Sequence, residues 1–515
     1  MMNAALTRRT FVQLCSLAGV LHRGMASAQA PVAGVPDAQA LSAAIALAQS
    51  DPDRPIYHFR PPANWNNDPN GTIYYRGWHH LFYQFNPAAP RGGNQHWGHA
   101  RSRDMVNWEH LPIAIRPSPD KGERAIFSGG ATLDQQGRPR LFYTSIGHPT
   151  PEQWMASPVD DDLIAWEKYS QNPVLALEAH GPVQVSQWRD PFLFKERGQT
   201  YMVCGGNLNN GAGGGGSVQL YQATNAELTR WRFLGVVFQY KDRAIWNIEC
   251  PNLFRVGAKW VLLMSPQQRC EYFIGNLDIA ACRFSPEAHG VLDAGAAYAS
   301  NISVDDKGRT ILWLWGRTNT SADKGWNGCM TLPRILSINA DGFLCQEPAQ
   351  EFDQLRGAAM DTPLNNLRGD SLELQADIVM GSSAEAGFDV RCAADGTPGL
   401  SIRVGRNGIL TVGSHRTAIR RSQERYGLRI FLDRRAVEVY VNSGEAAVFA
   451  TVDASPQDLG VAFMSQEVPA RGRGPATGEA VPGGRGASAA VPARLDSFKA
   501  WPMKAAAFDL ERFHV

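Results

Sequence analysis

The sequence predicts an all-β protein, in which a five-bladed β-propeller is followed by a C-terminal β-sandwich. From about residue 56, short runs of aromatic and β-branched residues alternate with turn residues, and long amphipathic helical patterns are absent. The chain also contains 50 glycines, 32 prolines and 14 tryptophans, a composition typical of many turns and aromatic-lined clefts.

The length and the charge of the chain narrow the classes of function. With 515 residues, the chain can form two or more domains with sizeable cores. The formal net charge is +1, so the sequence predicts neither nucleic-acid binding nor an acidic interaction tail. It gives no prediction of the oligomeric state. Seven of the eight cysteines follow Cys15, widely spaced and without C-x-x-C pairs, which argues against a disulfide framework or a zinc site.

Residues 1–30 have the form of a twin-arginine export signal. Thr7–Val12 carries the arginine pair, the apolar run Phe11–Leu21 follows, and Ala26-Ser27-Ala28 and Ala28-Gln29-Ala30 are candidate cleavage sites. The apolar run is too short to span a bilayer. We expect a periplasmic or secreted protein with no membrane anchor after signal removal. The alternative is a chance Arg-Arg pair before a buried helix.

Residues 51–350 are predicted to form the propeller, after an Ala-rich lead-in over 31–50 with room for a short helix. A weak repeat supports this prediction, because Trp108, Trp166 and Trp231 each follow a polar residue by a few positions, at spacings of 58 and 65 residues. Such spacing suits one four-stranded blade per repeat, although three tryptophans can also fall so by chance. The expected strands are Thr72–Tyr75, His80–Phe85, Ala125–Leu133, Leu141–Ser145, Pro191–Lys195, Thr200–Cys204, Val218–Ala223, Asn252–Arg255 and Trp260–Ser265.

Residues 358–505 are predicted to form the sandwich, because apolar and polar residues alternate more regularly there and tryptophan becomes rare. Glu467–Pro492 is rich in Gly, Pro, Ala and Arg and is expected to be a flexible loop. The expected strands are Leu372–Val379, Phe388–Arg391, Ser401–Val404, Gly408–Val412, Leu428–Leu432, Val437–Val441, Ala446–Val452 and Leu495–Met503.

One glycine-rich stretch, Gly205–Gly216, superficially resembles a phosphate-binding loop. It lacks a Gly-Lys-Ser/Thr ending and a following helix, so we interpret it as the tip of a hairpin.

Three carboxylates stand in similar local settings. Trp65–Gly71 is a dense turn signal that is expected to hold Asp68 in a rigid turn, which by itself could be structural. Asp190 lies between Arg189 and a proline just before a predicted strand, and Glu249 lies in an apolar stretch before another. For each acid alone, a surface turn or an ion pair is the simpler interpretation. Because the three fall in different predicted blades, we expect them to meet at one end of the central channel.

Such a group of acids suits glycoside hydrolysis. A retaining enzyme needs a nucleophile and an acid/base whose carboxyl groups are about 5–5.5 Å apart. We predict that Asp68 is the nucleophile, because neighbouring asparagine amides would stabilise its anion. We predict that Glu249 is the acid/base in its apolar setting, and that Asp190, ionised beside Arg189, stabilises the transition state.

Several motifs, in order, resemble glycoside hydrolase family 32, which contains invertases, levanases and inulinases. They are Trp65–Gly71 (W-x-N-D-P-N-G), Phe82–Pro87 (F-Y-Q-Y-N-P), Trp97–Trp108 (W-G-H-A-x-S-x-D-x-x-x-W), Phe127–Gly129 (F-S-G-S), Arg189–Pro191 (R-D-P), Glu249–Pro251 (E-C-P), Leu332–Arg334 (L-P-R) and the strand pair Leu428–Val441. The resemblance runs from about His58 to Trp501.

The resemblance implies the same fold, the same three catalytic roles and a β-fructofuranoside substrate, with no metal and no cofactor. It places six residues in the fructose subsite: Asn67, Gln84, Trp97, Phe127, Ser128 and Arg189. The chain departs from the family pattern at Asn66 (commonly Met), Ile248 (commonly Trp), Gly130 (commonly Ser) and Leu292–Tyr298, which leaves the leaving group open among sucrose, levan, inulin and fructo-oligosaccharides.

The prediction is therefore an exo-acting β-fructosidase. The alternatives are a fructosyltransferase of the same fold, a carbohydrate-binding protein that has lost catalysis, and an arabinanase-like propeller enzyme. Retention of all three acids argues against the second, and Trp65–Gly71 argues against the third.

Overall fold

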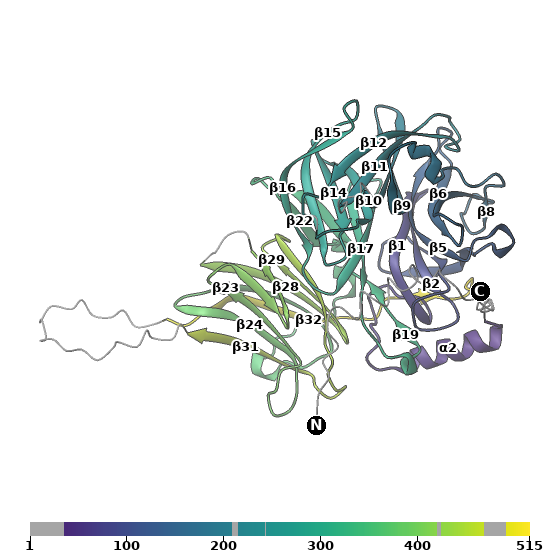
Figure 1. Ribbon diagram of the computed structural model, residues 1–515. Helices are drawn as coiled ribbons and strands as arrows, with labels where there is room; N and C mark the ends of the chain where they lie inside the picture. The colour runs from purple at the N-terminus through teal and green to yellow at the C-terminus, as the bar shows by residue number, and fades with distance from the viewer. Residues whose placement is uncertain (1–35, 209–214, 243, 420–423, 468–490, 515) are drawn as a thin grey trace, which may run out of the picture. The chain divides into compact units, whose positions relative to one another are not determined.

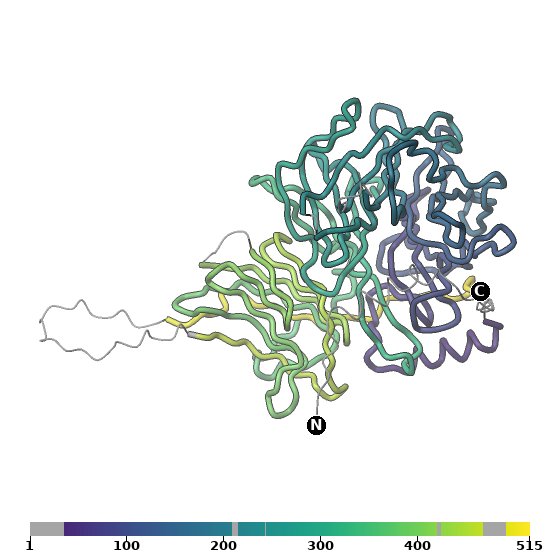
Figure 2. The backbone as a smooth tube through the Cα atoms, viewed as in Figure 1, coloured from purple at the N-terminus to yellow at the C-terminus, as the bar shows by residue number. Residues whose placement is uncertain are grey.

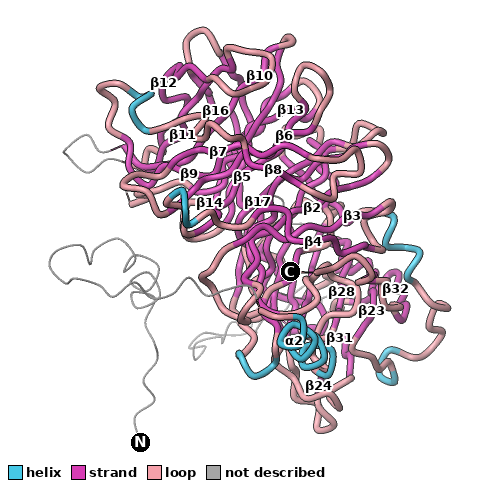
Figure 3. Tube along the Cα trace, turned by 90° about the vertical axis from the view of Figure 1, so that its right-hand side faces the viewer, coloured by secondary structure: helices cyan, strands magenta, loops and turns pink. Residues whose placement is uncertain are grey.

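The computed structural model describes residues 36–208, 215–242, 244–419, 424–467 and 491–514. The predicted export signal and nearly all of the predicted loop Glu467–Pro492 lie outside these ranges. Strands dominate, and α2 (Ala38–Ser50) is the only α-helix of the described ranges (Figure 3). The Asp37 side chain caps α2 by accepting from Ala40 N at 2.8 Å, so the Ala-rich lead-in does contain a short helix.

Five sheets are formed mainly by residues 64–348, coloured purple to teal in Figure 1. The first joins β1 (Asn64–Tyr75), β2 (Trp78–Asn86), β3 (His96–Ser102) and β4 (Trp108–Ile115), with the short strands β19 (Trp326–Asn327) and β33 (Phe508–Asp509) at its edges. The second contains β5 (Ala125–Leu133), β6 (Pro139–Ile146), β7 (Glu152–Pro158) and β8 (Trp166–Lys168). The third contains β9 (Val185–Glu196), β10 (Gln199–Leu208), β11 (Gly216–Ala223) and β12 (Trp231–Gln239).

The fourth and fifth sheets continue the pattern. The fourth contains β13 (Glu249–Val256), β14 (Lys259–Ser265), β15 (Cys270–Asp278) and β16 (Arg283–Asp293). The fifth contains β17 (Ala297–Val304), β18 (Thr310–Gly316), β20 (Cys329–Met330), β21 (Arg334–Ile338) and β22 (Leu344–Pro348). Short 3-10 turns occur at Pro119–Lys121, Leu177–His180, Ala322–Lys324, Gln350–Leu355 and Leu364–Asn366.

Two further sheets follow, green to yellow in the backbone trace of Figure 2. One contains β23 (Ser371–Val379), β28 (Arg425–Asp433), β29 (Ala436–Val441), β30 (Ala446–Thr451) and β32 (Arg494–Pro502), and the other β24 (Ser383–Cys392), β25 (Leu400–Gly405), β26 (Ile409–Val412), β27 (His415–Ala418) and β31 (Gly460–Glu467). One apolar core, including Leu374, Phe388 and Ile430, is shared by both sheets, as expected of a sandwich. Every expected strand coincides with or lies within an observed strand, apart from single residues at its ends. No expected strand extends more than one residue beyond the observed one.

The first strands of the five sheets contact one another in a closed cycle, in the order β1, β5, β9, β13, β17 and back to β1. Each of these strands has a register shift against its neighbour at a corresponding level, where one strand bulges. Bulges next to active sites redirect side chains. The irregular residues are Asn67–Asp68, Phe127–Ser128, Asp190–Pro191, Cys250–Pro251 and Ala299.

The tryptophan repeat is a structural repeat. The indole N–H of Trp108, Trp166 and Trp231 donates in each case to the carbonyl three residues earlier, at 2.9–3.1 Å. Each tryptophan starts the fourth strand of its sheet in chain order, β4, β8 or β12. The fourth sheet contains a similar turn before β16 without a tryptophan, where Cys282 has φ 48°.

The prediction of a turn at Trp65–Gly71 is wrong. These residues lie inside β1, which pairs with β2 and β19 through a bulge rather than reversing direction. Asp190 likewise lies within β9, and Glu249 is the first residue of β13. The predicted hairpin is confirmed, because β10 pairs antiparallel with β11, the next strand of the chain. Its tip starts later than predicted, since Gly205–Leu208 belongs to β10, and residues 209–214 lie outside the described ranges.

No helix in the described ranges has both the length and the apolar character needed to cross a membrane.

Candidate active site

The structure brings the three predicted acids together. The Cys250 thiol lies 3.5 Å from Asp68 Oδ2 and 3.7 Å from Asp190 Oδ2. Arg189 Nε lies 3.9 Å from Asp190 Oδ2, and the same guanidinium forms an ion pair with Glu249. The carboxylates from β1, β9 and β13 are thus linked through one thiol and one guanidinium.

The backbone at this point is strained. Asp190 and Cys250 have φ angles of 61° and 47°, in the left-handed region that residues with a side chain rarely adopt. The Cys250 N–H donates to Asp190 Oδ2 at 2.9 Å, and the Asp190 N–H donates to Thr144 Oγ1 at 2.9 Å. Such outliers persist where surrounding contacts hold them, and they cluster at functional sites.

Asp68 is held by hydroxyl and thiol groups. Ser128 Oγ lies 2.5 Å from Asp68 Oδ2, and Gln84 Nε2 donates to the same hydroxyl oxygen at 2.9 Å. Burial raises the pKa of Asp68 to about 7. The Ser128 hydrogen bond opposes this increase most, the charges of Asp190 and Glu249 add to it, and the Cys250 hydrogen bond also opposes it. At neutral pH the Asp68 carboxyl is therefore only partly ionised in the free site.

The asparagines do not stabilise the Asp68 anion, contrary to the sequence prediction. Asn70 Nδ2 donates to the backbone carbonyl of Asp68 at 3.1 Å, not to its carboxylate. The Asn67 amide oxygen and both amide atoms of Asn66 are buried without a hydrogen-bond partner. The anion depends instead on Ser128 and Cys250, which come from other sheets.

Asp190 is 5% exposed, and burial raises its pKa to about 6, although the Arg189 charge opposes the increase. The carboxylates of Glu249 and Asp190 raise the pKa of Arg189, although burial alone would lower it. Arg189 therefore stays charged and offsets part of the negative charge of the three acids.

Glu249 does not lie in the apolar setting that was predicted. Its Oε1 accepts from Arg189, and its Oε2 accepts from the Tyr298 hydroxyl at 2.5 Å. Its side chain is 21% exposed, so it borders solvent. Burial, followed by the Glu249 charge, raises the pKa of Tyr298, which keeps this phenol a donor.

The predicted fructose-subsite residues surround the acids at different depths. Asn67, Phe127 and Arg189 are partly exposed, whereas Gln84 and Ser128 are buried and contact Asp68 directly or through one hydroxyl. Trp97 is fully buried, and its indole N–H donates to the Phe127 carbonyl at 3.1 Å. Trp97 therefore holds the backbone of Phe127 in place rather than facing the site itself.

Two residues of the site were not predicted to contact the acids. The sequence indicates Cys250 only as an apolar neighbour and Tyr298 only as part of an unclear segment. The register of β17 and the bulge in β13 bring both side chains to the carboxylates. No local signal reveals these contacts, because Tyr298 and Glu249 are 49 residues apart.

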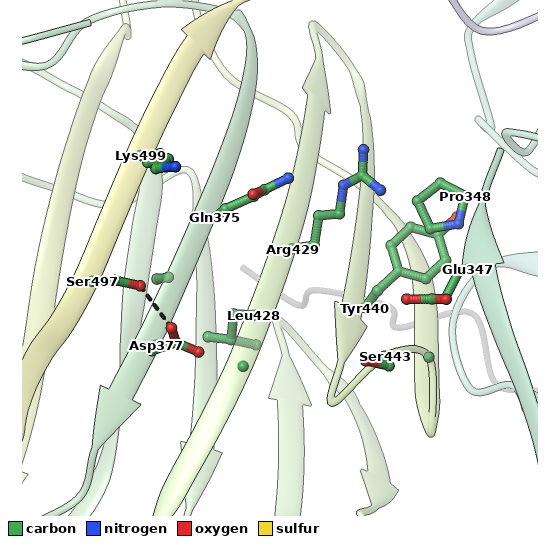
Figure 4. Close-up of a pocket in the computed structure, with 13 residues that line it drawn as sticks. Glu347, Pro348, Gln375, Asp377, Leu428, Arg429, Tyr440, Ser443, Ser497 and Lys499 are labelled. Carbon is green, nitrogen blue, oxygen red and sulfur yellow. Dashed lines mark hydrogen bonds between the residues drawn. The ribbon is translucent and has the colours of Figure 1, made fainter. Parts of the chain in front are cut away.

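A separate cavity of about 380 Å³ lies over the outer face of the sheet that contains β23 and β28, beside Glu347 and Pro348 (Figure 4). It contains none of the predicted site residues. Its Arg429 is already paired with Glu373 and Asp353 outside the cavity lining. In the described ranges, no group of three or more His, Cys, Asp or Glu side chains is arranged to hold a metal ion.

The fold is a closed cycle of five sheets that carries three linked acids, followed by a two-sheet sandwich, and comparison with known proteins gives the family. Residues 58–348 match the model of the glycosyl hydrolases family 32 N-terminal domain, and residues 345–471 match that of the family's C terminal. The chain belongs to glycoside hydrolase family 32.

Individual relatives agree with this assignment. The chain is 32% identical to the raffinose invertase of Escherichia coli over 442 residues, covering 77% of the chain and 89% of that protein. It is 34% identical to the β-fructofuranosidase insoluble isoenzyme 2 of Oryza sativa subsp. indica over 344 residues, covering 58% of the chain. That alignment spans only 56% of the rice protein, little more than half its length. The structure of fructan 1-exohydrolase IIa from Cichorium intybus has the same fold, with a TM-score of 0.75, 23% identity, and coverage of 89% of this chain and 99% of that one.

Proposed function

We propose that the protein is a retaining, exo-acting β-fructosidase that hydrolyses terminal β-D-fructofuranosides of the sucrose or fructan class. The observation that carries this proposal is the linkage of Asp68, Asp190 and Glu249 through Cys250 and Arg189. The names of the family relatives support hydrolysis rather than transfer of fructose. We also propose that the five sheets are five propeller blades over residues 51–350, with the sandwich over 358–505.

In the proposed mechanism, Asp68 attacks the anomeric carbon C2 of a terminal fructose and forms a covalent fructosyl-enzyme. Glu249 protonates the leaving oxygen, and then removes a proton from the water that releases fructose. Asp190 accepts hydrogen bonds from sugar hydroxyls that strengthen in the transition state. Burial raises the pKa of Asp68 in the free site, whereas the mechanism requires the Asp68 carboxylate to be ionised when it attacks the bound substrate.

The test uses two isosteric variants, Asp68→Asn and Glu249→Gln, with Glu196→Gln as a control. Glu196 lies at the far end of β9 and pairs with Arg255. With sucrose, we expect fructose release to fall about 10²–10⁴-fold in Glu249→Gln, and by roughly 10³-fold or more in Asp68→Asn. The control should stay within about twofold, because its partner lies outside the site.

A second substrate separates the two roles. p-Nitrophenyl β-D-fructofuranoside has a leaving group that departs without protonation, so Glu249→Gln should release p-nitrophenol far better than it hydrolyses sucrose. Asp68→Asn should be inactive with both substrates, because it lacks the nucleophile. Near-wild-type hydrolysis of sucrose by either variant contradicts the assignment.

Export remains a proposal based on the sequence of residues 1–30. Cell fractionation of the wild-type protein and an Arg8→Lys/Arg9→Lys variant tests it, since the variant should remain in the cytoplasm.

A further inference from the structure

A partly exposed patch of three side chains adjoins the acids from the fifth sheet. Tyr298 of β17 and Trp315 of β18 are cross-strand partners, so their side chains share a face. Arg317 follows Trp315 by two residues and lies on the same side of the chain. Its guanidinium carbon is 5.1 Å from the centre of the Tyr298 ring and 5.9 Å from that of Trp315.

Arg317 is held in place before any ligand binds. Its backbone N–H and its Nε both donate to the carbonyl of Ala296, at 3.2 and 3.0 Å. The Ala296 N–H in turn donates to the Phe449 carbonyl of β30 at 2.7 Å. A side chain positioned in this way loses little conformational entropy when it forms a further contact.

The patch connects the strands of the two proposed catalytic groups. Tyr298 donates to Glu249 Oε2, so one end of the patch touches the proposed acid/base. Trp315 packs edge-on against Trp65, with 6.3 Å between the ring centres. Trp65 precedes Asp68 by three residues in β1. Because Glu249 protonates the leaving oxygen, groups attached to that oxygen would lie next to Arg317.

The Arg317 charge has no carboxylate partner among the described residues. Arg189 and Arg334 of the same group of sheets each pair with an acid, whereas none of the ion pairs in the described ranges includes Arg317. Two aromatic faces stabilise its charge instead. The remaining donors of its planar fork are suited to sugar hydroxyls.

We propose that Arg317 is the residue that recognises the leaving group, by donating hydrogen bonds to hydroxyls of the neutral sugar attached to the scissile oxygen. This inference rests on the proposed function. A neutral sugar is favoured over a phosphorylated one because three carboxylates, offset only by Arg189, give the neighbouring site an excess of negative charge.

The test compares substrates that share the terminal fructose and differ in the leaving group. Sucrose carries a sugar leaving group, and methyl β-D-fructofuranoside carries only a methyl group. We expect Arg317→Met to lower kcat/KM for sucrose roughly 10- to 100-fold, as for hydrogen bonds from a charged donor. For the methyl fructoside, the change should stay below about threefold, because no leaving-group hydroxyl is present.

The matched control is Arg255→Met, which removes an arginine over the ring of Trp260 at 4.4 Å, away from the acids. It should leave both substrates unchanged. Arg317→Lys keeps the charge and the fold but loses the planar fork, so it should show the same substrate dependence with a smaller loss, and it carries the test if Arg317→Met does not fold.

An equal loss on both substrates would mean that Arg317 acts through Glu249, and no loss on either would exclude a role in binding. A loss of kcat/KM confined to sucrose 6-phosphate would mean that Arg317 recognises a phosphorylated leaving group rather than a neutral sugar. Each of these three results overturns the inference. Failure of the wild-type protein to release fructose from any substrate is a different result, because it overturns the proposed function.

Discussion

Arg334 of β21 donates to the carboxylate of Glu438 of β29 at 2.7 Å, and both side chains are fully buried. Glu438 also accepts from the backbone N–H of Leu332, at 2.5 Å, and lies 3.1 Å from His58 Nε2. The pair thus joins the fifth sheet to the sandwich. A buried pair of this kind adds little over apolar packing, but it is costly to break, because one charge is then left without a partner.

We therefore expect Glu438→Gln to destabilise the protein by about 3–5 kcal/mol. Denaturant unfolding at constant pH measures this change. The control is Glu347→Gln in neighbouring β22, where the side chain is exposed and the change should stay within about 0.5 kcal/mol. A loss below about 1 kcal/mol for Glu438→Gln would show that the buried pair does not stabilise the fold in this way.

His58 lies between two buried carboxylates, 2.8 Å from Asp433 and 3.1 Å from Glu438. Burial alone would lower its pKa, but these carboxylates raise it to about 9. Since an unfolded histidine has a pKa of about 6.5, the stabilisation should be complete below that pH and disappear as the pH rises through 9. The difference corresponds to about 3 kcal/mol.

Unfolding free energies measured between pH 6 and pH 10 test this expectation. Wild type should lose stability across that range, and His58→Gln should lose much less. At acid pH the trend reverses, because Glu438 has a pKa lowered to about 2, despite its burial, by Arg334 and His58. Its contribution should disappear as the pH falls from about 4 toward 2. Equal slopes in the two proteins above pH 6 would rule out a charged His58.

The sequence predicts the acids better than it predicts their surroundings. Asp68, Asp190 and Glu249 are found from short ordered motifs, and the sheets that hold them follow from strand patterns and turns. The turn predicted around Asp68 is wrong because pairing with β2 and β19 overrides the local preference of Asn-Asp-Pro-Asn-Gly. The partners of Glu249 could not be predicted, because Arg189 and Tyr298 reach it from other sheets.

The raised pKa of Asp68 should reduce stability at neutral and alkaline pH. Its folded pKa is about 7, against about 3.9 when unfolded, so the folded state binds more protons between these values. Stability should therefore fall as the pH rises from about 4 to 7. We expect Asp68→Asn to match wild type near pH 4 and to be about 2–4 kcal/mol more stable at pH 8.

Denaturant unfolding at the two pH values measures this difference. Asp161→Asn is the control, since that carboxylate is 87% exposed. The control should follow wild type at both pH values. If Asp68→Asn is no more stable than wild type at pH 8, the Asp68 carboxyl is not destabilised by the fold.

The Cys250 thiol should set the acid limb of the pH–rate profile. It lies 3.5 Å from Asp68 Oδ2, and its hydrogen bond lowers the pKa of Asp68 against the larger effect of burial. Cys250→Ala removes this bond, whereas Cys250→Ser replaces the thiol by a hydroxyl donor.

Because Asp68 must be ionised to attack, we expect the acid limb of the pH profile of kcat/KM to move up by about 0.5–1 pH unit in Cys250→Ala. In Cys250→Ser, the limb should stay at or below its wild-type position. The backbone N–H of Cys250 donates to Asp190, and neither substitution removes this donor, so the comparison isolates the side chain. Acid limbs that coincide in the alanine and serine variants would mean that the thiol does not control the ionisation of the nucleophile.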